Sequence, residues 1–161
     1  MSHYLQGEFD FVKRTKSILE QYSEIDFSTI TEESYEITLC MNCLMGLVVL
    51  PQQVWFSHVP NTDLNKDWFI KKTHISNINS GQYKINEIVK HIRNSVAHGN
   101  LTPISKDKGK NKKITHLQFK DYSDNKKTIL TFDATIPVET LKKFALKFAD
   151  TMLDIMKKTT A

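Results

Sequence analysis

The 161-residue sequence has few of the residues that mark specialised protein classes. Its two cysteines cannot form a disulfide scaffold, and five glycines and four prolines exclude collagen-like and linker-rich chains. With 40% hydrophobic and 25% charged residues, the composition is that of a soluble globular protein and not of a largely disordered one. The length predicts one domain, residues 1–161, which can bury a core without disulfide cross-links.

Long apolar runs are missing as well. The longest, residues 44–50 interrupted only by Gly46, is much shorter than the roughly 20 residues that cross a bilayer. Residues 1–11 mix His, Gln, Glu and Asp and show no charged-then-apolar signal-peptide pattern. We therefore expect a cytoplasmic protein that makes no membrane contact.

Arginine is scarce, because only Arg14 and Arg93 occur among the 22 basic residues. A guanidinium group is planar and binds a phosphate or carboxylate through paired hydrogen bonds, which the ammonium group of lysine cannot copy. The two arginines therefore hint at anion contacts, although a compositional bias towards lysine explains the count equally well.

The net charge of +4 lies in one short segment, residues 106–113, which holds five lysines and one aspartate. The remainder of the chain therefore sums to zero. Such a local concentration predicts either a contact with a polyanion or a solvated loop.

Apolar residues at three- and four-residue spacing predict four helices. A capping box, Thr29 with Glu32, marks the start of the second of them. The four cover residues 6–22, residues 29–50, a segment that opens between Asn79 and Tyr83 and stops at Gly99, and a final segment with Pro137 in its first turn.

Strand-like alternation lies between the third and fourth helices, on both sides of a Ser123-Asp-Asn125 turn, and predicts a β-hairpin. Residues 51–78 are expected to be irregular, with a short turn near Trp55 and Trp68. The predicted fold class is therefore mainly α, an up-down bundle of about four helices with a small β-hairpin before the last helix. The second helix is apolar nearly all round, which predicts burial at the bundle centre or against a second copy.

Polar side chains gather at the end of the third predicted helix, His91-Ile-Arg-Asn-Ser-Val-Ala-His-Gly99. Asn94 and His98 are four residues apart and His91 is three before Asn94, so these three share one face. Arg93 is five residues before His98, about 140° away around the axis at about 100° per residue. A purely structural interpretation makes Arg93 and His98 cations placed against the negative end of the helix dipole.

The spacing Arg93-Asn94-x-x-x-His98 resembles the Arg-x4-His motif of the HEPN superfamily, with its polar residue after the arginine. HEPN domains are compact helical bundles that are widespread in bacterial defence and toxin systems. The motif ends the third helix, a hairpin and a long final helix follow it, and the apolar segment 42–51 precedes it. In these features the chain resembles the plasmid-encoded HEPN subfamily over most of its length.

The resemblance implies a metal-independent RNA endonuclease that needs no cofactor and acts as a homodimer. Arginine and histidine from both chains would line one cleft, so Arg93 and His98 need not meet within one chain. His98 would act as general acid or base, Arg93 would hold the phosphate, and Asn94 would orient His98 or contact the phosphate. The expected products carry a 2′,3′-cyclic phosphate and a 5′-hydroxyl.

Partners follow from the same resemblance. RNA is the expected substrate, with an antitoxin or another defence-system protein as a further partner, in a toxin or anti-phage role. A HEPN branch with a tyrosine two residues after the histidine is regulated through that tyrosine; here the position is Asn100. Two alternatives stay open: a non-catalytic HEPN module that binds RNA, a nucleotide or a protein, and a purely structural helical dimer. The basic side chains expected to contact RNA are those of Lys106, Lys108, Lys110, Lys112, Lys113 and His91.

Motifs for metals and common cofactors are missing. Cys40 and Cys43 form a C-x-x-C, but they lie in an apolar helix with no second pair, so we interpret them as core residues. The remaining histidines share no metal-ligand spacing, and no P-loop or dinucleotide fingerprint occurs. No metal is therefore predicted. Trp55, Phe56 and Trp68 either pack under a loop or stack bases.

Overall fold

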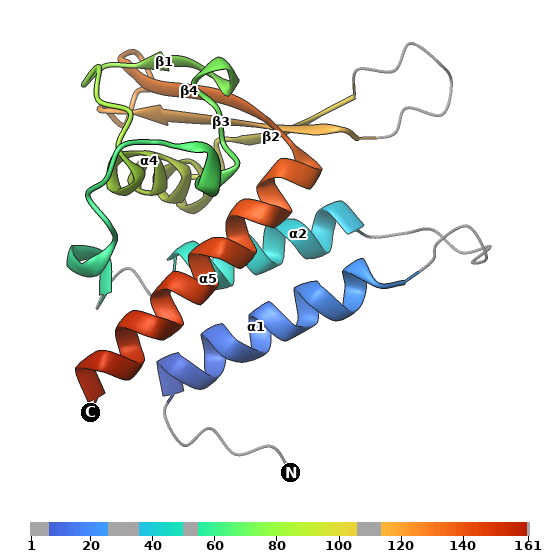
Figure 1. Ribbon diagram of the computed structural model, residues 1–161. Helices are drawn as coiled ribbons and strands as arrows, with labels where there is room; N and C mark the ends of the chain where they lie inside the picture. Colours follow the sequence, from blue (N-terminus) through green and yellow to red (C-terminus); the bar gives the residue numbers. More distant parts are fainter. Residues whose placement is uncertain (1–6, 26–35, 50–54, 106–113, 161) are drawn as a thin grey trace.

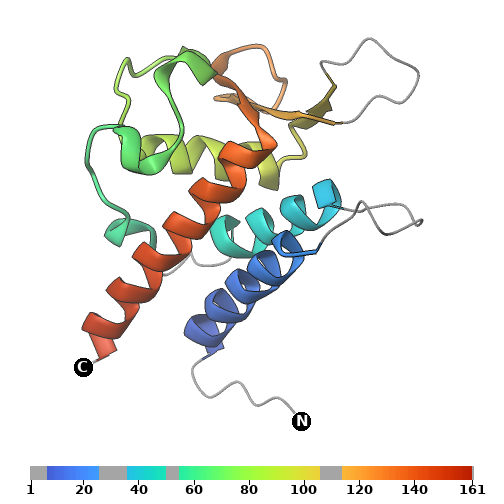
Figure 2. The same ribbon diagram turned by 45° about the vertical axis from the view of Figure 1, so that its right-hand side comes forward.

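The computed structural model describes residues 7–25, 36–49, 55–105 and 114–160. In these residues the chain folds into a four-stranded antiparallel sheet and a set of helices, and one helix, α4, lies directly beneath the sheet (Figure 1). The other long helices form a layer on the far side of α4, as both Figure 1 and Figure 2 show. The protein is therefore an α+β fold.

The predicted helices are present in the described residues. Helix α2 ends in a wider π-helical stretch, η2 (Met45–Val49), and the start of the second predicted helix lies outside the described residues. Within the described ranges the α-helices are α1 (Gly7–Ser23), α2 (Glu36–Leu44), α4 (Ile85–Ala97) and α5 (Val138–Thr160).

Helix α4 is positioned by a narrow apolar stripe. The side chains of Ile85, Ile88 and Ile92 are fully buried, between the sheet on one side and η2 on the other. Because α4 is covered on two sides, its polar residues His91 and Ser95 are buried, and its other polar residues are half-buried on the remaining faces and towards its C-terminal end. This end carries the candidate site.

A glycine sets the distance between α1 and η2. A Cβ atom on Gly46 would lie 3.1 Å from the Phe11 ring and 3.4 Å from the Thr15 methyl group. These separations are at or below ordinary van der Waals contact, so a larger residue at position 46 would require the Phe11 and Thr15 side chains to move by a few tenths of an ångström. The glycine that interrupts the longest apolar run is thus explained by helix packing.

The sheet has the strand order β1-β4-β3-β2. The predicted hairpin is confirmed as β3 (His116–Tyr122) and β4 (Leu130–Pro137), in which Phe119 pairs with Ala134. Inward side chains of both strands alternate with half-buried outward ones, as expected for a sheet covered on one face. The edge strands are β1 (Ile75–Ile78) and β2 (Leu101–Ile104).

The prediction of a mainly α bundle with a small hairpin is wrong, because β1 and β2 extend the hairpin to a four-stranded sheet. Strand β1 lies in the region expected to be irregular, where η3 (Phe56–His58), η4 (Lys66–Trp68) and η5 (Lys72–His74) precede it. Strand β2 contains Pro103, which argues against a strand in sequence but is tolerated at a sheet edge. Neither strand has the alternation that marks a strand locally.

Candidate functional site

The C-terminal end of α4 is fixed by a Schellman motif. The Asn100 N–H donates to the Ser95 carbonyl at 2.7 Å, and the Gly99 N–H donates to the Val96 carbonyl at 3.2 Å. Gly99 has a φ of 65°, the left-handed conformation that glycine adopts without strain, so the predicted helix stop is confirmed. His98 is therefore held in the last turn, directly before the chain reverses into β2.

Arg93 lies half-buried on α4. Its Nε atom is buried and has no hydrogen-bond acceptor, and no ion pair joins its guanidinium group to any residue the structure describes. A buried donor without an acceptor is unfavourable by about 1–3 kcal/mol, so the Arg93 side chain is not positioned by hydrogen bonding within the described part of the chain.

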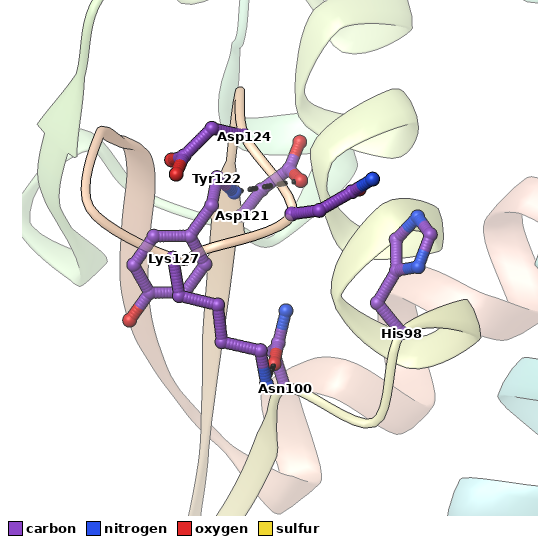
Figure 3. A pocket seen from close by; sticks show the side chains of 7 residues that line it. His98, Asn100, Asp121, Tyr122, Asp124 and Lys127 are labelled. Carbon is purple, nitrogen blue, oxygen red and sulfur yellow. Dashed lines mark hydrogen bonds between the residues drawn. The ribbon is translucent and has the colours of Figure 1, made fainter.

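His98 is exposed, and its ring makes no hydrogen bond within the described part of the chain. It lines a pocket of about 130 Å³ between the end of α4 and the turn that joins β3 to β4. Figure 3 shows His98 on the helix side of this pocket, with Tyr122, Asp124 and Lys127 opposite it. The His98 imidazole is therefore accessible to a molecule bound in the pocket.

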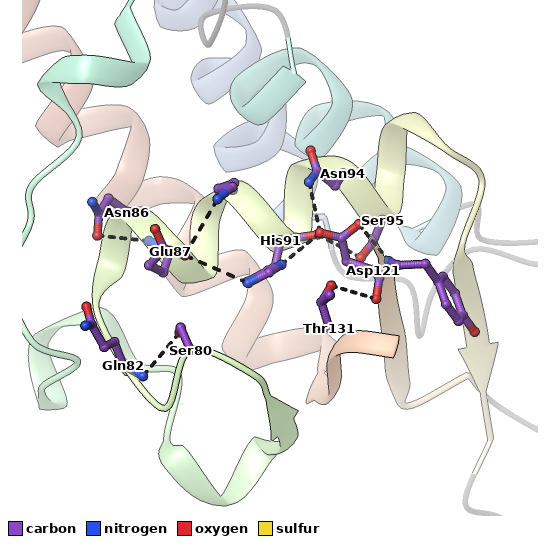
Figure 4. Close-up of polar contacts among 11 residues, drawn as sticks. Ser80, Gln82, Asn86, Glu87, His91, Asn94, Ser95, Asp121 and Thr131 are labelled. Atoms are coloured by element: carbon purple, nitrogen blue, oxygen red, sulfur yellow. Dashed lines mark hydrogen bonds and ion pairs between the residues drawn. The ribbon is translucent and has the colours of Figure 1, made fainter. Parts of the chain in front are cut away.

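Asp121, on β3, accepts hydrogen bonds from the two other polar residues of this helix face (Figure 4). Its Oδ2 atom lies 2.8 Å from His91 Nδ1 and 2.9 Å from Asn94 Nδ2, and its Oδ1 accepts from the Tyr122 N–H at 2.9 Å. Only 4% of Asp121 is exposed. This buried carboxylate therefore joins the motif helix to the sheet.

The His91 ring is packed as well as hydrogen-bonded. It stacks on Phe132 of β4, with ring centroids 4.9 Å apart, and its Nε2 lies 4.0 Å from a Glu87 carboxylate oxygen. Only 8% of His91 is exposed, so little of the ring is open to a ligand. Its predicted contact with RNA is untested, but the geometry gives it a partner within the fold.

The four predicted residues of this helix thus fall into two pairs. His91 and Asn94 are held by Asp121, and the Asn94 amide nitrogen is used in that contact, not in orienting the His98 ring. Arg93 and His98 make no hydrogen bond to one another within the chain, in agreement with their wide angular separation on the helix. Of these four residues, Arg93 and His98 are the two whose side chains make no hydrogen bond within the described residues.

A protein-family model, described as HEPN pEK499 p136, matches residues 1–159 of the chain. This protein is a member of the HEPN family. Comparison with curated proteins and with solved structures found no significant match. The resemblance indicated by Arg93, Asn94 and His98 is therefore confirmed at the level of the family.

Asp121 and most of the residues that line the pocket beside His98 were not among the site residues predicted for this HEPN chain. The Ser123-Asp-Asn125 turn was predicted, but nothing local in the sequence indicated that it approaches the end of α4. The missed lining residues are Asn100, Tyr122, Asp124, Asn125 and Lys127.

Other predicted features of this HEPN chain lie elsewhere. Lys106, Lys108, Lys110, Lys112 and Lys113 lie outside the described residues. Trp68 is buried against Phe144, with ring centroids 6.1 Å apart, which supports the packing interpretation for this tryptophan. Within the described ranges, no helix is long and apolar enough to cross a membrane, and no group of three or more His, Cys, Asp or Glu side chains is arranged to hold a metal.

The two cysteines are core residues. Cys40 and Cys43 are 1% and 3% exposed, and burial raises the pKa of the Cys43 thiol. Because thiolates are the reactive form, we expect alkylation at pH 8 to be at least about tenfold slower in the native protein than in urea. Mass spectrometry after timed iodoacetamide treatment measures this ratio. Equal rates in the two states would contradict the burial.

Proposed function

We propose that this HEPN protein is a metal-independent RNA endonuclease. The observation that carries the proposal is the availability of Arg93 and His98, set against the engagement of their neighbours His91 and Asn94 by Asp121. A fold that satisfies the adjacent polar groups yet leaves a buried guanidinium Nε without an acceptor favours an anion as the missing partner. The phosphodiester of RNA supplies such an anion.

In the proposed reaction the 2′-hydroxyl of the RNA attacks the adjacent phosphorus. His98 takes the proton from this hydroxyl, or gives a proton to the departing 5′-oxygen, and solvent water completes the other transfer, since an imidazole can serve in either role near neutral pH. Arg93 binds the non-bridging oxygens and offsets the charge that develops on them. The P–O5′ bond breaks as the P–O2′ bond forms, which leaves a 2′,3′-cyclic phosphate and a 5′-hydroxyl.

The proposed site is composite and uses two copies of the chain. Within one chain no hydrogen bond joins Arg93 to His98, and their positions on α4 differ by about 140° at about 100° per residue. A second copy that presents its own motif would bring one chain's arginine to the other chain's histidine. Asn94 would contribute its free amide oxygen, and the lysines of residues 106–113 would add phosphate contacts. We assign the protein to toxin or anti-phage defence, with an antitoxin-like partner.

The test is a cleavage assay with excess EDTA. End-labelled tRNA and mRNA are incubated with purified protein, and product ends are identified by mass spectrometry. We expect cleavage that survives the chelator and leaves 2′,3′-cyclic phosphate ends, and a dimer by light scattering. Binding of these RNAs without any cleavage would contradict the catalytic assignment and favour a non-catalytic HEPN module.

A further inference from the structure

We propose that the pocket beside His98 binds one nucleotide of a single-stranded RNA, with its base in the pocket and its phosphate at the rim. This inference rests on the proposed function, because it uses the same end of α4. The pocket measures about 130 Å³, well below the roughly 300–1,000 Å³ of sites that enclose a drug-sized ligand. It therefore suits a single ring system.

The wall opposite His98 is a preformed turn. The Asp124 carboxylate accepts hydrogen bonds from the Thr128 N–H at 3.0 Å, the Thr128 hydroxyl at 2.9 Å and the Ile129 N–H at 2.8 Å. These hydrogen bonds lower the pKa of Asp124, and the bond from the Ile129 N–H has the largest effect. The carboxylate is therefore ionised at neutral pH and holds the backbone of the turn through these bonds. A wall fixed before binding loses little conformational entropy when a ligand arrives.

Lys127 has a backbone conformation that lysine rarely adopts. Its φ is 56°, a left-handed conformation in which glycine or asparagine is the unstrained choice. The side chain crosses the pocket and donates one hydrogen bond to the Asn100 amide oxygen, two residues after His98. An ammonium group has three donors, so two remain for a phosphate at the rim.

The other residues that line the pocket favour binding of a base over binding of a phosphate. Two carboxylates, Asp121 and Asp124, face this region, and their oxygens already accept hydrogen bonds from the protein. A phosphate inside the pocket would be repelled by both. The Tyr122 ring offers an apolar face, and the amide groups of Asn100 and Asn125 offer donors and acceptors to a base edge.

Asp121 contacts both this pocket and the helix that carries the motif, α4. It lines the pocket and also holds His91 and Asn94, which lie on the same helix as Arg93. The turn and the end of α4 are therefore held in one fixed relation. A base bound against Tyr122 would place the neighbouring phosphate beside His98.

The experiment measures affinity and not cleavage. A fluorescent pool of random-sequence 2′-fluoro RNA has no attacking 2′-hydroxyl, so its anisotropy reports binding alone. We expect Tyr122→Ala to weaken binding about tenfold, since it removes a stacking surface. Tyr122→Phe, which keeps the ring, is expected to stay within about twofold of the wild type.

The variant Lys127→Gly tests the pocket without an expected loss of stability. Glycine relieves the left-handed strain, so the melting temperature is expected to hold or rise. RNA affinity is expected to fall about three- to tenfold. The slope of log affinity against log salt concentration is expected to decrease by about one, as for the loss of one phosphate contact. Lys126→Ala removes the same charge from the same turn outside the pocket lining and is expected to leave affinity within about twofold. A stabilised Lys127→Gly protein with unchanged affinity would overturn the pocket assignment.

The outcomes separate this inference from the endonuclease proposal. If the pocket variants weaken binding but the wild type never cuts natural RNA, the nucleotide site stands and the catalytic assignment falls. If the wild type cuts and the pocket variants bind normally, the nucleotide site is wrong and catalysis stands. If the wild type fails to bind the pool, the nucleotide site is overturned, and a protein partner becomes the better explanation for this surface.

Discussion

His98→Ala is expected to lower the rate of RNA cleavage by about 10²–10⁴-fold, because it removes the proposed proton-transfer group from the site. Arg93→Ala is expected to have a comparable effect, since it removes the proposed contact to the phosphate. Arg93→Lys keeps the charge but loses the planar fork, so a partial loss is expected. Initial rates on a labelled substrate in EDTA measure all three.

Melting temperatures distinguish the loss of a catalytic group from a loss of folded protein. Within the described residues neither side chain has a hydrogen-bond partner in the fold, so neither variant is expected to lower the melting temperature, and Arg93→Ala, which removes the buried unpaired donor, is expected to hold or raise it. Lys90→Ala removes another cation from α4, one that lies 3.8 Å from Glu87, and serves as the matched control with full activity. Unchanged cleavage by the His98 and Arg93 variants would contradict the site and indicate a different nuclease.

Asp121→Ala is expected to lower the free energy of unfolding by about 3 kcal/mol, because it leaves the buried His91 and the half-buried Asn94 without their acceptor. For a chain of this size that loss corresponds to a fall in melting temperature of roughly 6–12 °C. Calorimetry or thermal circular dichroism measures the fall. Asp121→Asn keeps one acceptor oxygen and is expected to lose less.

The control for this prediction is an aspartate in an exposed ion pair. Asp150 on α5 accepts a hydrogen bond from Lys16 at 2.6 Å, but half of its side chain is exposed. The pair raises the pKa of Lys16, yet solvent screens such contacts, so Asp150→Ala is expected to lose no more than about 1 kcal/mol. Equal losses in the two variants would show that Asp121 does not anchor α4 to the sheet.

The helices and the hairpin were predicted because their signals are local. The stripe of Ile85, Ile88 and Ile92 repeats at helical spacing, and Gly99 marks the helix stop within a few residues. The β3–β4 hairpin is likewise encoded by alternation on both sides of one turn. Strand β1 has no such signal, since its residues are joined to β4 by contacts such as Ser76 to Asp133, which are 57 positions apart.

For the candidate site, the sequence alone determined the residue types and their order on one helix, Arg93-Asn94-x-x-x-His98, and through them the family. Which of these side chains have hydrogen-bond partners depends on the tertiary contacts of α4. For His91 and Asn94 the partner is Asp121, which lies 27 residues after Asn94 and reaches it because β3 packs against α4. The same packing brings the Lys127 turn to His98 and makes a pocket from segments that are separate in sequence. Spacing along a helix is set by local geometry, whereas the partner of a buried polar group is set by the packing of the whole chain.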